Sequence, residues 1–160
     1  MAVDMFIKIG DVKGEAQDSK HKDEIDVLSW SWGLSQSGNA QVGSGAGAGK
    51  VNVQDLTFTK YVDSSSPYLM TVCCNGKHYG EALLTVRKAG ENPVEYLKIK
   101  MTEVMVSSLS TGGSGGEDRL TENVTLNFAK VDVKYTPQKA DGGPGTAIPF
   151  AWDIAANIKG

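Results

Sequence analysis

The glycine-rich segment that ends at Gly49-Lys50 invites comparison with a phosphate-binding loop, whose backbone N–H groups cradle phosphates beside a lysine and a hydroxyl side chain. The first glycine of that motif would fall on Ser44, and Val51 stands where Ser or Thr must reach the magnesium ion. The dinucleotide-binding pattern fails as well, because its third glycine would fall on Ala48. We therefore predict a flexible or assembly loop and no nucleotide cofactor.

The two histidines offer little basis for metal chemistry. His21 lies in a charged turn, and His78 follows the expected end of a helix, far away in the sequence. Neither has the short spacing to another histidine or a cysteine that zinc sites show. We predict that both are solvated surface histidines and that no metal is bound.

The cysteines and serines are the candidate nucleophiles of the chain. Cys73 and Cys74 are adjacent, and such pairs rarely bridge each other because the ring they would close is strained. Free thiols fit folding in a reducing cytosol, with at least one packed inward. No serine lies in G-x-S-x-G within a strand-to-helix turn. A hydrolase that uses Cys74, His78 or the Glu117 cluster is the alternative class, and it lacks a complete catalytic constellation.

A compact charged cluster follows the second glycine-rich loop. It contains Glu117, Asp118 and Arg119, with Glu122 three residues further on. Paired carboxylates could serve acid–base catalysis. The interpretation that we favour is a local ion-pair group between a loop and a strand, with Glu117, Asp118 and Arg119 touching a neighbouring subunit.

Length and composition predict one globular domain spanning residues 1–160. Hydrophobic residues make up 40% and charged residues 22%, the usual mixture of a folded domain. The formal net charge is -3, and the lysines are scattered among acids, which argues against nucleic-acid partners. We recognise no signal peptide or membrane-spanning segment. We expect a cytoplasmic protein that leaves the cell, if at all, by a route that reads no N-terminal signal.

The segment around the first two tryptophans is the most informative strand. Its large apolar residues, Leu28, Trp30, Trp32 and Leu34, alternate with small polar residues that include Ser29, Ser31 and Ser35. Side chains alternate between the two faces of a strand, so an apolar anchor on one face leaves the serines on the other. Given the ring that the family resemblance described below implies, we predict that Ser29, Ser31 and Ser35 line its channel or a subunit interface; an ordinary solvent-facing surface is the alternative.

The segment from Gly38 to Gly49 is nearly all Gly, Ala and Ser. It has few side chains to pack and would lose much conformational entropy on ordering. Given the stacked rings that the family resemblance described below implies, we predict that it becomes ordered against an adjacent subunit or a stacked ring, and we assign a stacking role to Gly43, Gly45, Gly47 and Gly49.

The rest of the chain reads as strands with one short helix. We expect the helix at about residues 67–74, between a serine cap and the left-handed stop at Asn75-Gly76. Further strands are predicted at 2–9, 81–88, 94–108, 120–135 and 148–158. An extra residue near Ala129 is expected to re-aim its strand, as a sheet needs where it curls. The pattern predicts a β-barrel or a strongly curled sandwich.

Longer stretches of the sequence resemble a known family. These are the opening MAVDMFIKI, LSWSWG with its glycine loop, KVNVQD, KHY, VRKAG and above all SGGEDRLTENVTLNF. Together they span nearly the whole chain in a conserved order. The chain resembles Hcp, the haemolysin-coregulated protein of type VI secretion.

The resemblance implies an all-β fold, a small β-barrel of two curled, mostly antiparallel sheets with one short flanking α-helix. It implies a non-enzymatic subunit that forms hexameric rings, which stack into a hollow tube inside a contractile sheath. The tube is expelled with a spike at its tip, and its lumen shelters small effector proteins. A secreted effector-carrier or chaperone ring that builds no tube is the alternative function.

Overall fold

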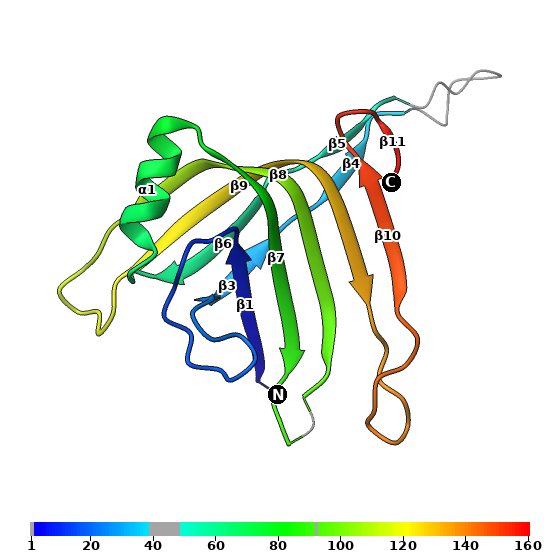
Figure 1. Cartoon of the computed structure of the whole chain (residues 1–160), viewed down its shortest axis with the longest axis horizontal. Coiled ribbons are helices and arrows are strands. Elements are labelled where there is room, and N and C mark those ends of the chain that lie inside the picture. The colour runs from blue at the N-terminus through cyan, green and yellow to red at the C-terminus, as the bar shows by residue number, and fades with distance from the viewer. Residues whose placement is uncertain (1, 39–48, 92) are drawn as a thin grey trace.

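The computed structural model describes residues 2–38, 49–91 and 93–160. Within these ranges the chain is mostly β, with one helix (Figure 1). The elements are β1 (Val3–Ile9), β2 (Ile25–Asp26), β3 (Ser29–Ser31), β4 (Leu34–Gln36), β5 (Val51–Val53), β6 (Leu56–Tyr61), α1 (Ser66–Asn75), β7 (His78–Lys88), β8 (Glu95–Thr111), β9 (Thr121–Tyr135), β10 (Ile148–Asp153) and β11 (Ile158–Lys159). The all-β class with one short helix is therefore confirmed.

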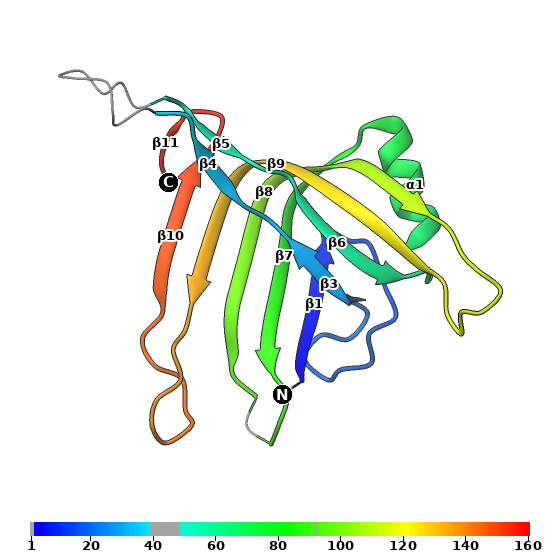
Figure 2. The ribbon, with the colours of Figure 1, turned by 180° about the vertical axis from the view of Figure 1, so that it is seen from behind.

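Nine strands form one strongly curled antiparallel sheet. The order β11-β10-β9-β8-β7-β1-β2 is followed by hydrogen-bonded neighbours, and β6 joins β9 and β3 away from this path. The long strand β9 pairs with β6 along its first part and with β10 along its second. Figures 1 and 2 show the result, in which β1 and β7 lie on one side of the curl and β3 and β6 on the other.

One extended segment connects the two sides of the curl. Val27 N donates to Met5 O of β1 (2.9 Å), and Leu28 N donates to Thr59 O of β6 (2.8 Å). The two residues between β2 and β3 therefore bridge from β1 to β6. No ladder joins β2 to β3 within the described residues, so the sheet curls like a barrel without closing into one. The separate β4–β5 ribbon forms the second, smaller sheet.

Two predicted strands are interrupted. The predicted strand from Leu28 to Ser37 breaks at Trp32-Gly33 into β3 and β4, which pair with different partners. Leu28 and Leu34 are 38% and 45% exposed, so only the two tryptophans of the apolar set pack against the core. The predicted strand 148–158 is also split, because a turn at 154–157 reverses the chain from β10 to β11.

A shared bend crosses the three central strands. The buried positions switch parity at Gly80 in β7, Glu103 in β8 and Ala129 in β9, which lie at one level of the sheet. Glu103 has φ 56°, a left-handed backbone that turns the strand. The expected re-aiming near Ala129 is confirmed. The extra residue that we expected near Ala129 is not found, because the pairing register is the same on both sides of this level in both ladders.

Helix α1 spans Ser66–Asn75, close to the predicted 67–74. Proline lies in its first turn, and Gly76 ends it with φ 68° and a backbone N–H bond to Val72 O. Ser65 occupies the N-cap position without a capping side-chain bond, because its hydroxyl donates to Asp63 Oδ1 instead. The helix packs on β8 through Leu69 and Val72, which join the central core.

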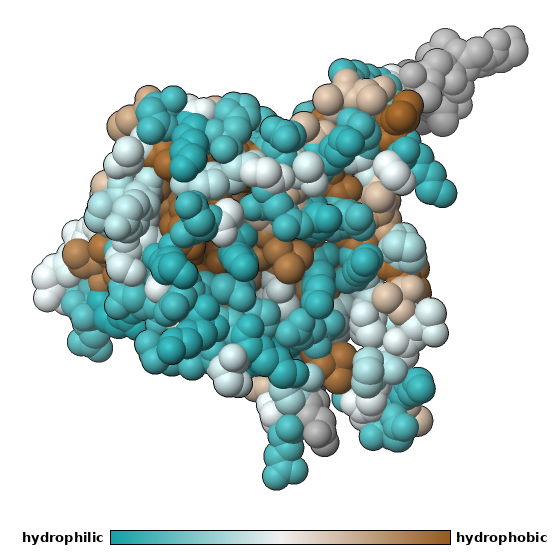
Figure 3. Space-filling view, in the orientation of Figure 1, coloured by the Kyte–Doolittle hydropathy of each residue, from teal (hydrophilic) through white to brown (hydrophobic). Residues whose placement is uncertain are grey.

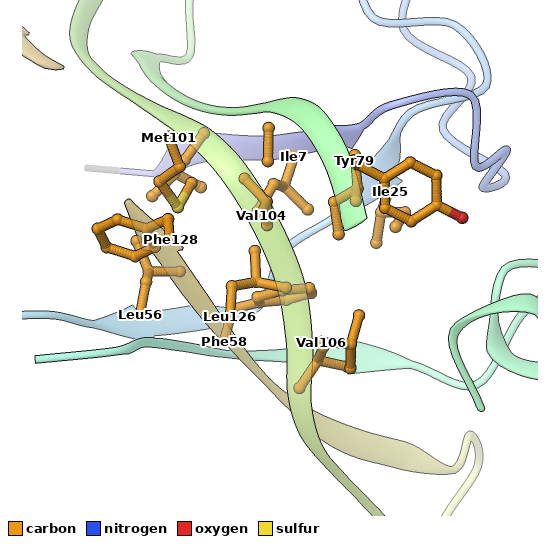
Figure 4. Close-up of a cluster of buried hydrophobic side chains, with 14 of the residues drawn as sticks. Ile7, Ile25, Leu56, Phe58, Tyr79, Met101, Val104, Val106, Leu126 and Phe128 are labelled. Carbon is orange, nitrogen blue, oxygen red and sulfur yellow. The ribbon is translucent and has the colours of Figure 1, made fainter. Parts of the chain in front are cut away.

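The core fills the inside of the curled sheet. Figure 4 shows side chains from opposite walls meeting there, with Ile7 on one side and Phe58 and Leu126 on the other. Ile7, Leu126 and Phe58 are at most 1% exposed. Each Å² of apolar area removed from water stabilises the folded state by about 25 cal/mol, so this core is the main source of stability.

The prediction that His21 is a solvated histidine is wrong. Its ring stacks on Phe6 with centroids 4.5 Å apart, and the residue is 7% exposed. Its Nδ1 lies 2.8 Å from Glu24 Oε2 and its Nε2 lies 3.0 Å from Glu95 Oε1. The bonds tie the long β1–β2 connection to the start of β8. His78, by contrast, is exposed as predicted.

Candidate functional site

A wall of small polar side chains covers the outer surface of four adjacent strands. In the pairing register, Ser29 of β3 faces Thr59 of β6, which faces Asn123 of β9, which faces Ser110 of β8. The next row has the same form and consists of Ser31, Thr57, Thr125 and Ser108. All eight residues are exposed or half-buried. We call these eight residues the hydroxyl face; the strands that carry it lie toward the viewer in Figure 2.

Side-chain hydrogen bonds link neighbouring residues of this face. Thr57 Oγ1 and Thr125 Oγ1 are 3.1 Å apart, and Thr59 Oγ1 donates to Asn123 Oδ1 at 2.7 Å. Beyond the second row, Asp55 accepts bonds from Ser107 (3.0 Å) and Asn127 (2.9 Å). Cross-strand pairs of this kind stabilise a sheet and fix its rotamers. The surface is therefore smooth and ready to form hydrogen bonds with water or a bound protein.

The opposite side of the same strands explains why the hydroxyl face must point outward. Trp30, Phe58, Val124 and Leu109 occupy one cross-strand row there, and all four belong to the core or pack against it. Because side chains alternate along a strand, burying this row leaves the serines and threonines outside. A register slip of one residue would expose Phe58, so the register is strongly specified.

The structure brings together some of the predicted serines. Ser29 and Ser31 lie on the hydroxyl face, whereas Ser35 lies on the separate β4–β5 ribbon opposite Asn52 and joins neither row. The remaining members, Thr57, Thr59, Thr125, Asn123, Ser108 and Ser110, were not predicted. Their signal was present in the alternation of threonine with large residues along β6 and β9. The sequence did not reveal that these strands neighbour β3.

The predicted interface charges lie together, but their fourth companion does not. Glu117, Asp118 and Arg119 are exposed in the β8–β9 connection, and the Arg119 guanidinium lies 3.7 Å from the centroid of the Tyr61 ring. Glu122 instead points into the core, so the proposed cluster of four is wrong. No described residue forms an ion pair with Glu117, Asp118 or Arg119.

An aspartate near Arg119 is electrostatically perturbed. Burial raises the pKa of Asp26 in β2, and the positive charge of Arg119 opposes that shift. Arg119 thus combines a stacking contact with a long-range charge interaction. The stacking contact attaches the end of the β8–β9 connection to Tyr61 of β6.

The residues of the alternative hydrolase are scattered. Cys74 is exposed on α1, His78 begins β7, and Glu117 lies in the β8–β9 connection. No hydrogen bond joins any two of them in the described part of the chain. Cys73 packs against the core, as expected for one of the two thiols. Across residues 2–38, 49–91 and 93–160 no group of three or more metal-binding side chains is found.

The predicted stacking glycines are only partly covered. Gly43, Gly45 and Gly47 lie outside the described residues. Gly49 lies at the base of the β4–β5 ribbon, where a Cβ atom would come within 2.3 Å of Ser37 Oγ. A larger residue at position 49 would therefore require the Ser37 and Gln36 side chains to move. The stacking role of all four glycines stays a prediction.

Comparison with known proteins assigns the family. Residues 6–135 match the family described as "Type VI secretion system effector, Hcp". The chain belongs to the Hcp family. Protein hcp1 of Pseudomonas aeruginosa is 67% identical over 161 residues, a match that covers 99% of each chain. The family resemblance is thereby confirmed, and it places the chain among the structural proteins of type VI secretion.

Solved Hcp structures share the fold. A type six secretion system protein with 31% identity superposes with a TM-score of 0.94, covering 99% of this chain and 100% of that one. Hcp1 from Salmonella typhimurium has 41% identity and a TM-score of 0.83, covering 99% of each chain. No helix of the described residues has the length and hydropathy needed to span a bilayer.

Proposed function

We propose that this Hcp chain is the subunit of a type VI secretion inner tube. Six copies form a ring, and rings stack into a hollow tube that is exported. The observation that carries the proposal is the hydroxyl face, a curved polar wall whose two outer strands have backbone edges without partners. Contractile sheath and spike proteins are the partners of the assembled tube, and small effector proteins are its cargo.

The two edges of the hydroxyl face suit self-association. Within the described residues β3 pairs only with β6, and residues 106–111 of β8 form no ladder beyond β9. The directions of β3, β6, β9 and β8 alternate, so β3 of one copy can meet β8 of the next as a further antiparallel pair. Repeating four strands per copy would give one continuous ring-shaped sheet. Pairing would also satisfy the exposed edge groups, which otherwise invite aggregation.

Exposed apolar side chains also support an assembled state. Tyr135, Ile148, Phe150 and Ile158 are between 39% and 61% exposed on β9, β10 and β11. Soluble monomers rarely leave such neighbouring strands uncovered. Contact between copies would remove this surface from water.

In the proposed ring the hydroxyl face lines the lumen. Ser29 and Ser31 then contact cargo together with Thr57 and Thr125, while the core behind them stays sealed. Small hydroxyl groups keep the wall wettable and adapt to many protein surfaces, since each hydroxyl both donates and accepts hydrogen bonds. The segment containing Gly43, Gly45, Gly47 and Gly49 is proposed to contact the next ring, and Glu117, Asp118 and Arg119 a neighbouring subunit.

Disulfide trapping tests the edge pairing. Cysteines are introduced at Ser31 and Ser108 in a Cys73→Ala, Cys74→Ser background, with Ser29 and Ser110 as a second pair that allows for a different register. Within one copy the two positions are three strand spacings apart, about 14 Å, too far for a disulfide. Oxidation should therefore link separate copies into a ladder that ends at six chains on a non-reducing gel.

The matched control places the two cysteines at Lys134 and Ser108. Only Ser108 then lies at an edge of the hydroxyl face, so cross-linking should give only dimers that form by chance collision. If the edge pair gives no more cross-linking than this control while rings are visible by electron microscopy, the edge model is wrong and the ring uses another surface. If no rings form at all, the tube function itself fails.

A further inference from the structure

Three neighbouring hollows form a groove around the turn that follows β1. The largest, of about 510 Å³, lies between α1 and residues 11–13. The second shares residues 11–13 with it, and the third shares Lys8 and Gly10 with the second and extends onto β7. The strands that carry the hydroxyl face lie on the other side of the curl (Figures 1 and 2). The groove therefore belongs to a separate surface.

Five exposed lysines line this groove. They are Lys8, Lys13, Lys20, Lys22 and Lys77. None of them forms an ion pair with a described carboxylate. Four other strand lysines, Lys60, Lys98, Lys100 and Lys130, have acidic partners, whereas Lys88, Lys134 and Lys159 form no ion pair within the described residues and are spread over β7, β9 and β11. An uncompensated basic cluster on a chain of net charge -3 is a local asymmetry that composition alone does not reveal.

The acids of the groove do not neutralise it. Glu81 is paired with Lys100 at 3.3 Å. Asp11, Asp23 and Glu24 remain, three acids set against five lysines. The local potential is therefore positive, and it favours a ligand with several negative charges.

Apolar and aromatic side chains line the largest hollow. Val12, Val72 and Tyr79 are buried there, and Tyr68 is 63% exposed at its margin. The Lys77 ammonium lies 5.0 Å from the centroid of the Tyr79 ring. Figure 3 shows this face, where hydrophilic residues surround apolar residues that remain visible beside α1. The groove thus offers a pocket for apolar side chains inside a basic rim.

Gly10 shapes the groove. Its φ is 49°, and a Cβ atom at this position would lie 2.3 Å from Tyr79 Cδ1. The turn therefore lies directly against the tyrosine, which keeps Asp11 and Lys13 at the mouth of the hollow. Asp11 and burial together raise the pKa of Tyr79, burial being the larger effect. The tyrosine stays neutral and serves as an apolar surface.

We infer that this groove docks an acidic segment of another protein, carrying glutamates or aspartates with an apolar side chain that enters the hollow. An acidic protein segment suits this groove better than nucleic acid, because the rim contains lysine without arginine and the hollow is lined by aliphatic Val12 and Val72 as well as by tyrosine. If the chain forms a tube, this surface would lie away from the lumen and available to a surrounding protein. The inference itself does not depend on ring formation.

A synthetic peptide tests the inference. The probe is a fluorescein-labelled 16-residue amphipathic helix with glutamates on one face and leucines on the other; its analogue has glutamine in place of every glutamate. Fluorescence anisotropy with the full chain should show saturable binding of the glutamate peptide and about tenfold weaker binding of the glutamine peptide. Lys13→Glu with Lys77→Glu should weaken the glutamate peptide by about tenfold as well, since attraction is replaced by repulsion.

The matched control is Lys134→Glu with Lys139→Glu, which removes the same charge away from the groove and should leave binding within about twofold. Tyr68→Ala should weaken both peptides by loss of the apolar contact. Three outcomes would overturn the inference: no saturation up to millimolar chain, equal loss in the control variant, or tighter binding to duplex DNA or phosphatidylserine vesicles than to the peptide. Size-exclusion chromatography of each variant shows whether assembly is intact, so a failed groove and a failed ring are distinguished.

Discussion

Lys60 and Glu122 face each other inside the core on neighbouring strands β6 and β9, with Lys60 Nζ donating to Glu122 Oε1 at 2.5 Å. Both side chains are fully buried. Lys60 Nζ also donates to Ser66 Oγ at 3.0 Å, and Asp63 Oδ1 lies 3.0 Å away. The pair therefore joins the sheet behind the hydroxyl face to the first turn of α1.

Breaking this pair on one side should be costly. Lys60→Met alone leaves Glu122 as a buried charge without a partner, so we expect the free energy of unfolding to fall by about 3–5 kcal/mol. Glu122→Leu should cost less, because Lys60 keeps Asp63 at 3.0 Å. The double variant removes both charges and should recover most of that loss. Urea titration of all four proteins at one protomer concentration measures the effect. Additive losses in the double variant would show that the two side chains do not act as a pair.

The left-handed backbone at Glu103 predicts a stabilising glycine. Because φ is 56° there, a side chain costs about 1–2 kcal/mol that glycine avoids, partly offset by the entropy glycine loses on folding. We expect Glu103→Gly to raise the free energy of unfolding by about 1 kcal/mol and Glu103→Val to lower it. Gly80→Ala, at the same level without positive φ and with open space around it, is the control and should change little. A destabilised Glu103→Gly would contradict the bend.

Asp18 should contribute to acid sensitivity. Its hydrogen bond from Arg87 lowers its pKa to about 2, below the ordinary value of 3.8. A lowered pKa in the folded state gives stability that is present above pH 4 and is lost as the pH falls toward 2. Asp18→Asn should therefore be less stable than the parent at pH 7, and the gap should narrow between pH 4 and pH 2. Thermal unfolding at several pH values measures it.

Glu91→Gln is the control for Asp18→Asn, since Glu91 is exposed and takes part in no ion pair within the described chain. It should leave the pH profile unchanged. A constant gap between Asp18→Asn and the parent from pH 7 to pH 2 would mean that the Arg87 contact does not depend on the charge of Asp18.

A bulky charge on the hydroxyl face should separate cargo binding from assembly. Ser31→Arg places a long cation among Thr57, Thr125 and Ser108 without touching the buried row beneath. We expect rings to form as before and co-purification of a lumen cargo to fall at least about tenfold, through steric exclusion and lost hydrogen bonds. Ser35→Arg, on the separate ribbon, is the matched control. Unchanged cargo retention in Ser31→Arg would remove this residue from the lumen wall.

Local patterns in the sequence predicted much of the fold. The alternation around Trp30 predicted the outward direction of Ser29 and Ser31, and Pro67 and Gly76 predicted both ends of the helix. Such signals depend on neighbours in the chain, so the sequence carries them directly. The four-residue rows of the hydroxyl face depend on pairings between residues far apart, such as Ser31 with Thr57 and Thr57 with Thr125.

Burial of polar side chains was the main failure. Lys60, Glu122 and His21 all carry groups that ordinarily prefer water, and each is buried because a partner from a distant segment satisfies it. Glu122 was grouped with Glu117 by proximity in the sequence, whereas strand alternation turns it inward. The basic groove was missed for a similar reason, since its lysines come from β1, the segment after it and the turn before β7.

Negative-stain electron microscopy of the purified chain tests the central claim most directly. We predict annular particles with six-fold symmetry and a central hole, and short stacks of such rings at high protein concentration. Compact particles the size of one chain, at every concentration up to the millimolar range, would contradict the claim that the hydroxyl face lines a ring.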